Sequence, residues 1–168
     1  MTTLEELVRF LDNNKLMIVT AESCTAGLQT SMLADVTGCG SVLEGGYVVY
    51  SERAKEVSLG VDAKTIQDFG LTSEEVAREM AQGALSVSSA DIAIANTGKA
   101  ESDDELDGVV CFACALRRHQ QIYVVSEMLR FLGDRNEVRK AAARHGLLGI
   151  PAFYEQLVKQ AADAPAPW

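Results

Sequence analysis

The sequence predicts an α/β fold: a three-layer α/β/α arrangement around a mixed, mostly parallel sheet. Amphipathic helical segments alternate with short apolar strands through most of the 168 residues, and this alternation is typical of parallel strands joined by crossover helices. Near residue 120, two strand-like runs flank a short polar turn, which predicts a hairpin and therefore an antiparallel pair in the sheet. The length favours one domain over 1–168, and we expect the tail at 163–168 to fray.

Each element follows from a local pattern. A first helix is expected at 3–13, where apolar residues recur at helical spacing, and a helical pattern that starts at Ser23 stops near Gly38. Gly45 and Gly46, inside one strand, indicate a bulge or a close backbone approach. The expected strands are 16–19, 42–50, 91–96, 109–116 and 122–128, and the later helices are 52–58, 63–69, 73–88 and 134–162, the last with weak points at Gly146, Gly149 and Pro151.

The composition is that of an ordinary globular protein in water, with 48% apolar and 23% charged residues. The formal net charge of −9 argues against nucleic acid as a partner, because nucleic acid requires a clustered basic surface. No apolar run approaches the roughly 18 residues that span a bilayer, and the acidic, amphipathic amino terminus differs from a signal peptide. We therefore expect a cytoplasmic protein with no membrane partner.

Four cysteines are too few for a disulfide framework in a chain of this length. Cys111 and Cys114 have the spacing of a redox or zinc pair. They lie within the expected strand 109–116, however, where residues three apart point to opposite faces. No second pair is present to complete a zinc site, so we expect packing cysteines and no metal.

Three strand-like runs each stop at a polar cluster, and these clusters lie at 20–27, 50–55 and 96–98. If the strands are parallel, all three clusters collect at one edge of the sheet. Ligands of open α/β sheets bind beyond the carboxyl ends of the strands. The sequence therefore predicts one cleft that contains a serine, a tyrosine and a lysine.

Ser23 directly follows the first strand at the start of a helical pattern. One interpretation is a helix N-cap, a position that serine favours. The other is a nucleophile on a strand-to-helix turn, where the N–H groups of Cys24, Thr25 and Ala26 stabilise an oxyanion. Gly27 would then let a substrate approach closely.

A serine hydroxyl needs a base to become nucleophilic. His119 is expected in the hairpin turn and His145 in the last helix, so neither is placed at the cleft. Lys55 is placed at the cleft. A lysine whose pKa is lowered by burial can act as a base, and Tyr50 would relay the proton or orient the amine. The alternatives are that Lys55 is a solvated surface residue and that Tyr50, at the end of its strand, packs on the next helix. A distance of about 3.2 Å or less between Lys55 Nζ and Ser23 Oγ would support proton transfer.

Arg135 begins the final helix directly after the last strand, which also ends at the common edge. A helix N-terminus with an arginine is suited to a phosphate or a carboxylate. The alternative is that Asp134 caps the helix and the arginine pairs with an acid.

The segment 20–27, Thr-Ala-Glu-Ser-Cys-Thr-Ala-Gly, closely resembles the TAESCTGG signature of the CinA carboxy-terminal domain family. The resemblance spans roughly residues 4–150 in one collinear match. It continues through Tyr50–Lys55, Leu59–Val61, Thr72–Ala77, Met80-Ala81, Thr97-Gly98 and Gly133–Arg135.

The resemblance implies a nicotinamide mononucleotide deamidase of the pyridine nucleotide cycle, which hydrolyses the carboxamide to a carboxylate and releases ammonia. It implies an α/β/α fold, no metal or cofactor, and a homodimer. The longer CinA proteins carry an additional amino-terminal domain, so the resemblance covers only the deamidase part. By the family's motifs, the catalytic residues are Ser23, Tyr50 and Lys55, and the substrate is bound by Thr97 with Gly98 and by Arg135.

The third motif departs from the family pattern TGIAGPxGG. The segment 97–108 lacks the proline and the paired glycines, and it carries acidic residues instead: Glu101, Asp103, Asp104, Glu105 and Asp107. This density of carboxylates would repel a substrate phosphate unless the side chains face solvent or bind a cation. In addition, Ala26 replaces the usual glycine of the first motif.

Three functions stay open. The first is deamidation of nicotinamide mononucleotide, a phosphorylated pyridine nucleotide. The second is a non-catalytic nucleotide-binding or interaction protein, and the third is an amidase for a different, non-phosphorylated amide. A short-chain dehydrogenase is excluded because the Tyr–Lys spacing differs and no GxGxxG follows the first strand.

Overall fold

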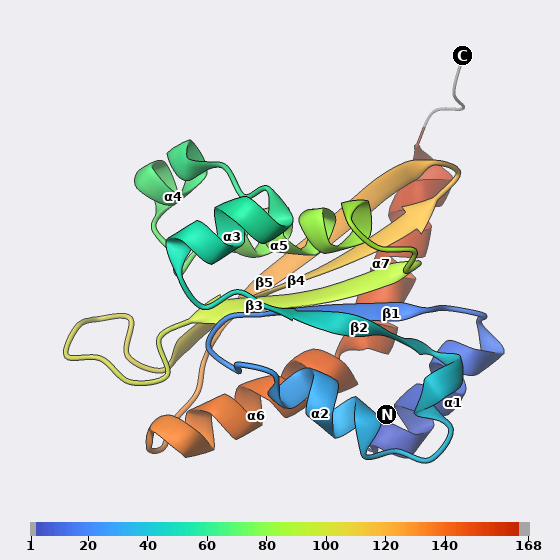
Figure 1. Cartoon of the computed structure of the whole chain (residues 1–168), viewed down its shortest axis with the longest axis horizontal. Coiled ribbons are helices and arrows are strands. Elements are labelled where there is room, and N and C mark those ends of the chain that lie inside the picture. Colours follow the sequence, from blue (N-terminus) through green and yellow to red (C-terminus); the bar gives the residue numbers. More distant parts are fainter. Residues whose placement is uncertain (1–2, 165–168) are drawn as a thin grey trace.

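The computed structural model describes residues 3–164. Within them, a five-stranded sheet in the order β2-β1-β3-β4-β5 forms the centre of the molecule (Figure 1). Strands β2, β1 and β3 are parallel, and β4 is antiparallel to both of its neighbours. The predicted mixed, mostly parallel sheet is therefore confirmed. The strands are β1 (Ile18–Glu22), β2 (Leu43–Val48), β3 (Ile92–Gly98), β4 (Val109–Arg118) and β5 (Gln121–Arg130).

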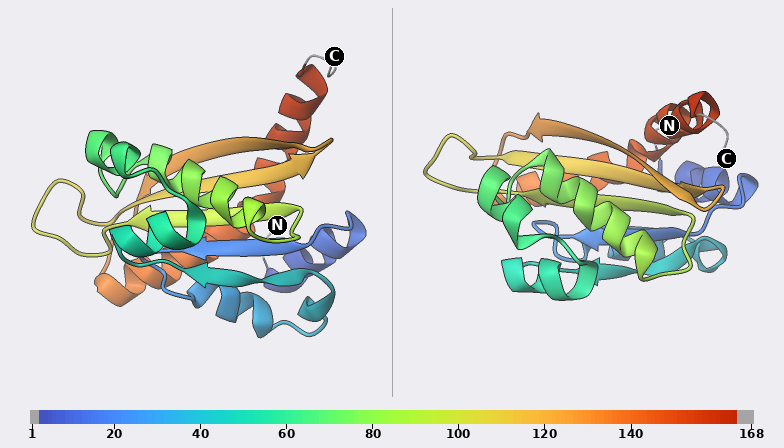
Figure 2. Two further views of the ribbon diagram at one scale, coloured as in Figure 1. Left: turned by 45° about the horizontal axis from the view of Figure 1, so that its top comes forward. Right: turned by 90° about the horizontal axis from the view of Figure 1, so that it is seen from above.

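Helices cover both faces of the sheet, which confirms the three-layer arrangement (Figures 1 and 2). One face carries α3 (Glu52–Leu59), α4 (Ala63–Phe69) and α5 (Glu74–Ser86). The other face carries α1 (Leu4–Asn13), α2 (Leu28–Ala34), α6 (Arg135–Leu148) and α7 (Ile150–Asp163). A short 3₁₀ turn, Cys39–Ser41, leads into β2. Within residues 3–164, no helix is both long and apolar enough to cross a membrane.

The two faces of the sheet have different cores, because side chains alternate along a strand. In β3, Ala93 and Ala95 face α5, whereas Ile92 and Ile94 face the α1 and α7 side. The same alternation separates the two strand cysteines, which belong to opposite cores. Both thiols are fully buried, and burial raises the pKa of Cys111 to about 12 and that of Cys114 still further. They are packing residues, as predicted.

The long helix predicted at 134–162 is divided into two helices that meet at Gly149, one of the three weak points expected within it. Pro151 lies at the start of α7, where a missing N–H does not disrupt a helix. The tail prediction is only partly tested: Asp163 is the last helical residue, and 165–168 lie outside the described residues.

The hairpin is confirmed, but its strands are longer than predicted. Only His119 and Gln120 form the turn, and both have positive φ, +50° and +64°. Such a pair matches the twist of two-residue hairpins. The β4–β5 ladder therefore extends to the pair of Arg118 and Gln121.

Candidate functional site

The polar clusters meet at one edge of the sheet, as predicted. Glu22, the last residue of β1, lies beside Val48 of β2 and Asn96 of β3 in the strand register. Strand β5 runs in the same direction as these three and leads into α6. Figure 2 shows the segments that follow β1, β2 and β3 at the same end of the sheet. We call this end the carboxyl edge.

Lys55 reaches Ser23 from the first turns of α3. Its Nζ lies 2.9 Å from Ser23 Oγ, a distance that supports proton transfer. The same Nζ donates to the backbone carbonyls of Val49, at 2.9 Å, and Tyr50, at 3.1 Å. The lysine is 1% exposed, and its burial lowers its pKa to about 8. The alternative of a solvated lysine is wrong.

Ser23 is not at the start of a helix, so the N-cap interpretation is wrong. Helix α2 begins at Leu28, and its cap is Gly27 in the left-handed region, with φ +96°. Residues 23–27 form a turn in which Ala26 N–H donates to the Ser23 carbonyl, and Ala26 also has positive φ. Ser23 N–H donates to the Asn96 carbonyl of β3, which fixes the serine to the sheet.

The expected oxyanion donors are therefore reduced from three to two. The Ala26 N–H is taken by the turn itself. Among residues 3–164, the N–H groups of Cys24 and Thr25 donate to no other residue. Gly27 adopts the left-handed backbone conformation that leads into α2, and its N–H donates to the Glu22 carboxylate.

The Cys24 thiol does not compete with Ser23 as a nucleophile. Its Sγ is buried 3.5 Å from Asn96 Oδ1. Burial raises the pKa of this thiol to about 11. Because the thiolate is the reactive form, Cys24 is inert near neutral pH.

Glu22 is the organising residue of this turn, and the sequence reasoning missed it. Its carboxylate is fully buried and accepts hydrogen bonds from the backbone N–H groups of Gly27, Gln29 and Thr30, at 2.8–3.0 Å. The hydroxyls of Thr20, Thr25 and Thr30 also donate to it. A carboxylate with this number of donors can remain buried. The only signal in the sequence is a glutamate at the end of an apolar strand.

A second buried residue, Asn96, connects the turn to α2. Its amide nitrogen donates to Thr25 Oγ1 at 2.8 Å and to Gln29 Oε1 at 2.9 Å. Among the described residues, no buried side-chain nitrogen or oxygen lacks a partner. A fully satisfied polar network of this kind holds its members in one arrangement.

Tyr50 contacts Lys55 through its carbonyl and not through its phenol. The phenol accepts a hydrogen bond from Arg135 at 2.9 Å, and the tyrosine is 56% exposed. Asp134 caps α6 together with Glu137. These carboxylates take the N–H groups of Asp134, Asn136 and Glu137, so the guanidinium of Arg135 is the charged donor that this helix start offers to an anion.

Thr97 and Gly98 serve packing in this structure. The Thr97 hydroxyl is buried and donates to the Leu71 carbonyl at 2.8 Å. A Cβ at Gly98 would lie 2.5 Å from the Val109 carbonyl oxygen. Because the Thr97 hydroxyl gives its hydrogen to Leu71, it could contact a substrate in this arrangement only as an acceptor.

The acidic segment 99–107 folds on itself and extends from the carboxyl edge, seen as the yellow loop in Figure 1. Lys99 pairs with Asp104, and Ser102 donates to the same carboxylate. These hydrogen bonds, that from Lys99 first, lower the pKa of Asp104 to about 2. Arg130 holds the carbonyls of Glu105 and Asp107. Among residues 3–164, no three His, Cys, Asp or Glu side chains come together in a way that could hold a metal ion.

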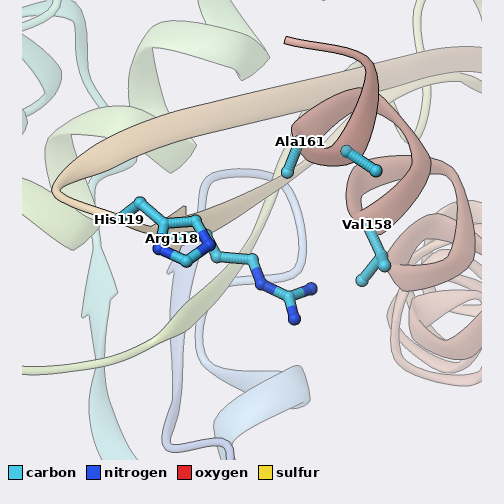
Figure 3. Close-up of a pocket in the computed structure, with 5 residues that line it drawn as sticks. Arg118, His119, Val158 and Ala161 are labelled. Atoms are coloured by element: carbon cyan, nitrogen blue, oxygen red, sulfur yellow. The ribbon is translucent and has the colours of Figure 1, made fainter. Parts of the chain in front are cut away.

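The hollow drawn in Figure 3 lies far from this site. It holds about 160 Å³ between the β4–β5 turn and α7, at the opposite end of the sheet. Arg118 and His119 line it together with small and apolar residues of α7. None of the predicted catalytic or binding residues lines it.

The sequence matches the model of the CinA C-terminal domain family over residues 1–153. A CinA-like protein of Chlorobium limicola is 48% identical over 163 residues, which cover 94% of this chain and 38% of the relative. A CinA-like protein of Chlorobium phaeobacteroides is 43% identical over 141 residues, 80% of this chain and 33% of the relative. The chain thus spans about one third of the length of the curated relatives it matches.

Two solved structures resemble the fold over most of both chains. The competence/damage inducible protein CihA from Agrobacterium tumefaciens has a TM-score of 0.80 and 35% identity, and covers 90% of this chain and 95% of its own. A competence-damaged protein (CinA) superfamily protein from Escherichia coli has a TM-score of 0.80 and 31% identity, with 89% and 90% covered.

Proposed function

Because the chain belongs to the CinA C-terminal domain family, we propose that it is an amidohydrolase acting on the carboxamide of nicotinamide mononucleotide. The products are nicotinic acid mononucleotide and ammonia. The observation that supports this most directly is the 2.9 Å contact between the buried amine of Lys55 and the hydroxyl of Ser23. A serine and a base in direct contact are what nucleophilic catalysis requires.

The surroundings of Lys55 suit a base. A neutral amine has two hydrogens and one lone pair. The carbonyls of Val49 and Tyr50 accept the two hydrogens, so the lone pair points to the Ser23 hydroxyl. With a pKa of about 8, about one tenth of the amine is neutral at pH 7. The two carbonyls therefore orient the amine for proton transfer.

The reaction then proceeds in two halves. The Ser23 oxygen attacks the amide carbon while its proton passes to Lys55, and the N–H groups of Cys24 and Thr25 stabilise the oxyanion. Lys55 returns the proton to the leaving nitrogen, the C–N bond breaks, and ammonia leaves an acyl ester on Ser23. Water loses a proton to Lys55 and hydrolyses the ester, which restores the serine and yields the carboxylate.

Arg135 is the residue proposed to bind the substrate phosphate. It begins α6 at the carboxyl edge, and the one hydrogen bond of its side chain among the described residues is to the exposed phenol of Tyr50. A guanidinium can bind phosphate through two parallel hydrogen bonds. We assign Tyr50 to the orientation of this guanidinium.

A specific observation favours a second candidate, an amidase for a non-phosphorylated amide. Glu101, Asp103 and Glu105 are exposed on the loop that extends from the same edge. Unlike Asp104 and Asp107, their carboxylates hold no hydrogen bond within residues 3–164. Because all three side chains face solvent, only a long-range repulsion, weakened by water and salt, opposes a phosphorylated substrate.

The test is ammonia release by the pure protein from nicotinamide mononucleotide, from its dephosphorylated nucleoside and from free nicotinamide. Ser23→Ala and Lys55→Met are expected to abolish release, and Lys140→Met, on the exposed side of α6, is the matched control. Ammonia release from nicotinamide mononucleotide alone supports the first candidate, the mononucleotide deamidase. Ammonia release from the nucleoside alone supports the second candidate, the amidase for a non-phosphorylated amide. Nucleotide binding without release would mean a non-catalytic protein, and full activity of Ser23→Ala would exclude the mechanism.

A further inference from the structure

We infer that Glu22 and Arg139 are positioning residues that hold the turn 23–27 from opposite sides and direct the Thr25 N–H toward the reacting side of Ser23. Neither residue belongs to the predicted catalytic set. The inference rests on the proposed function, because it assigns how the oxyanion donors of that reaction are fixed.

Glu22 holds the end of the turn that leads into α2. The first free N–H groups of a helix normally bind solvent, a cap or an anion. Here those of Gln29 and Thr30, and that of Gly27, bind the Glu22 carboxylate. A buried negative charge at the positive end of a helix is favourable. This helix end is therefore already occupied, and it is not the place where a substrate anion binds.

Arg139 holds the other side of the turn. From α6, its Nε donates to the Cys24 carbonyl at 2.8 Å, and a terminal nitrogen donates to the Thr25 carbonyl at 3.1 Å. The same side chain is steadied by Asn136 Oδ1 at 3.2 Å. One guanidinium thus fixes two consecutive peptide groups, which suits its rigid, planar set of donors.

The direction of the Thr25 N–H follows from peptide geometry. In a trans peptide, the N–H points opposite to the carbonyl of the same peptide group. The carbonyl of the 25–26 peptide faces Arg139, and its N–H, that of Ala26, returns to the Ser23 carbonyl. The carbonyl of the 24–25 peptide faces the same guanidinium, so the Thr25 N–H also points away from α6, toward the Ser23 side.

Neither residue takes part in proton transfer. Among the described residues, the Glu22 carboxylate accepts hydrogen bonds from donors in 20–30 and none from Ser23 or Lys55. In the same part of the chain, the Arg139 guanidinium donates to two carbonyls and an amide oxygen. Their effect on the reaction must come through the position of the turn.

Glu22→Gln and Arg139→Ala test this, with Lys140→Ala as the control on the next position of α6. For the amide that the unmodified chain hydrolyses, we expect kcat to fall about 100-fold in both variants, the loss typical of a misplaced oxyanion donor. KM should change less than about threefold, and the pH profile set by Lys55 should not move. Added guanidinium ion should raise the kcat of Arg139→Ala at least about tenfold and should leave the kcat of the unmodified chain unchanged.

The second readout does not depend on activity. Hydrogen exchange of the Gly27, Gln29 and Thr30 amides, followed by NMR, should become at least about tenfold faster in Glu22→Gln. If the unmodified chain releases no ammonia from any amide, the proposed function fails, and exchange alone decides whether Glu22 holds the turn. Unchanged exchange, a kcat within threefold of the unmodified chain in Arg139→Ala, or no rescue by guanidinium would each overturn the inference.

Discussion

The Nζ of Lys55 lies 2.9 Å from the Oγ of Ser23, although the two residues are 32 positions apart. The amine is almost fully buried, and burial holds its pKa near 8, below its ordinary value of 10.5. A base must lose its proton before it can accept one. The protonation of Lys55 should therefore limit the activity at neutral pH.

We predict that kcat/KM of the active enzyme rises with pH and levels off above an apparent pKa of about 8. Below this pKa the ammonium form predominates, so the rate should fall about tenfold for each pH unit. Lys55→Arg keeps the positive charge and stays protonated, so it should be inactive at every pH. Initial rates of ammonia release from pH 6 to 10 provide the measurement. A flat profile over this range would remove Lys55 from the role of base.

Replacing Tyr50 by phenylalanine distinguishes two roles for this residue. The variant loses the hydrogen bond from Arg135 but keeps the backbone carbonyl that accepts from Lys55. If the phenol orients the arginine, KM for the nucleotide should rise about tenfold while kcat changes little, since one charge-assisted hydrogen bond is lost. The same variant should show no defect with the dephosphorylated nucleoside. A fall in kcat with a shifted pH profile would instead return Tyr50 to the proton relay suggested by the sequence.

The acidic loop provides an electrostatic test of substrate class. Glu101→Gln, Asp103→Asn and Glu105→Gln together remove three negative charges and leave Asp104 and Asp107, which hold the loop together. We expect KM for nicotinamide mononucleotide to fall several-fold at low ionic strength, and the difference to disappear in about 1 M salt. KM for the uncharged amide nicotinamide is the internal control and should not change. Equal effects on both substrates would show that the loop acts other than by charge.

The edge where the site lies could be predicted because it depends on local patterns. Apolar runs that end in polar clusters identified the ends of β1, β2 and β3, and the hairpin placed β5 parallel to them. Within that edge, the position of Ser23 directly after the first strand and of Lys55 early in the next helix selected these two residues, and the family resemblance then matched them. The distance between the two side chains required the structure, since it depends on how α3 packs against the sheet.

The start of α2 could not be predicted, for a physical reason. Serine and threonine near a helix start usually act as caps, which favoured Ser23. In the structure, the Glu22 carboxylate takes the free N–H groups and the helix starts five residues later, at Leu28. Glu22 and Arg139 look like ordinary charged residues in the sequence, because their partners are defined only by the folded turn.

The glycine pair of β2 allows a matched test of how the threonines that donate to Glu22 are packed. The sequence predicted a bulge or a close approach at Gly45-Gly46, and the structure has both. The β1–β2 register shifts beside Gly45. A Cβ at Gly46 would clash with Thr30 Oγ1 and lie 2.6 Å from Thr20 Oγ1, both of which donate to Glu22. A Cβ at Gly45 would meet no atom within 4 Å.

Gly46 itself is exposed on the edge strand, but its Cβ would press on the hydroxyl of the fully buried Thr20 and on that of Thr30. We therefore expect Gly46→Ala to lower the free energy of unfolding by about 1–3 kcal/mol, as overpacking does. It should also reduce activity, because the displaced threonines support the carboxylate that holds the turn. Gly45→Ala, one residue away in the same strand, should change stability by less than about 0.5 kcal/mol. Urea unfolding of the two variants and the unmodified chain provides the comparison. Equal stability of the two variants would mean that the threonines can move aside, and Glu22 would then not depend on their positions.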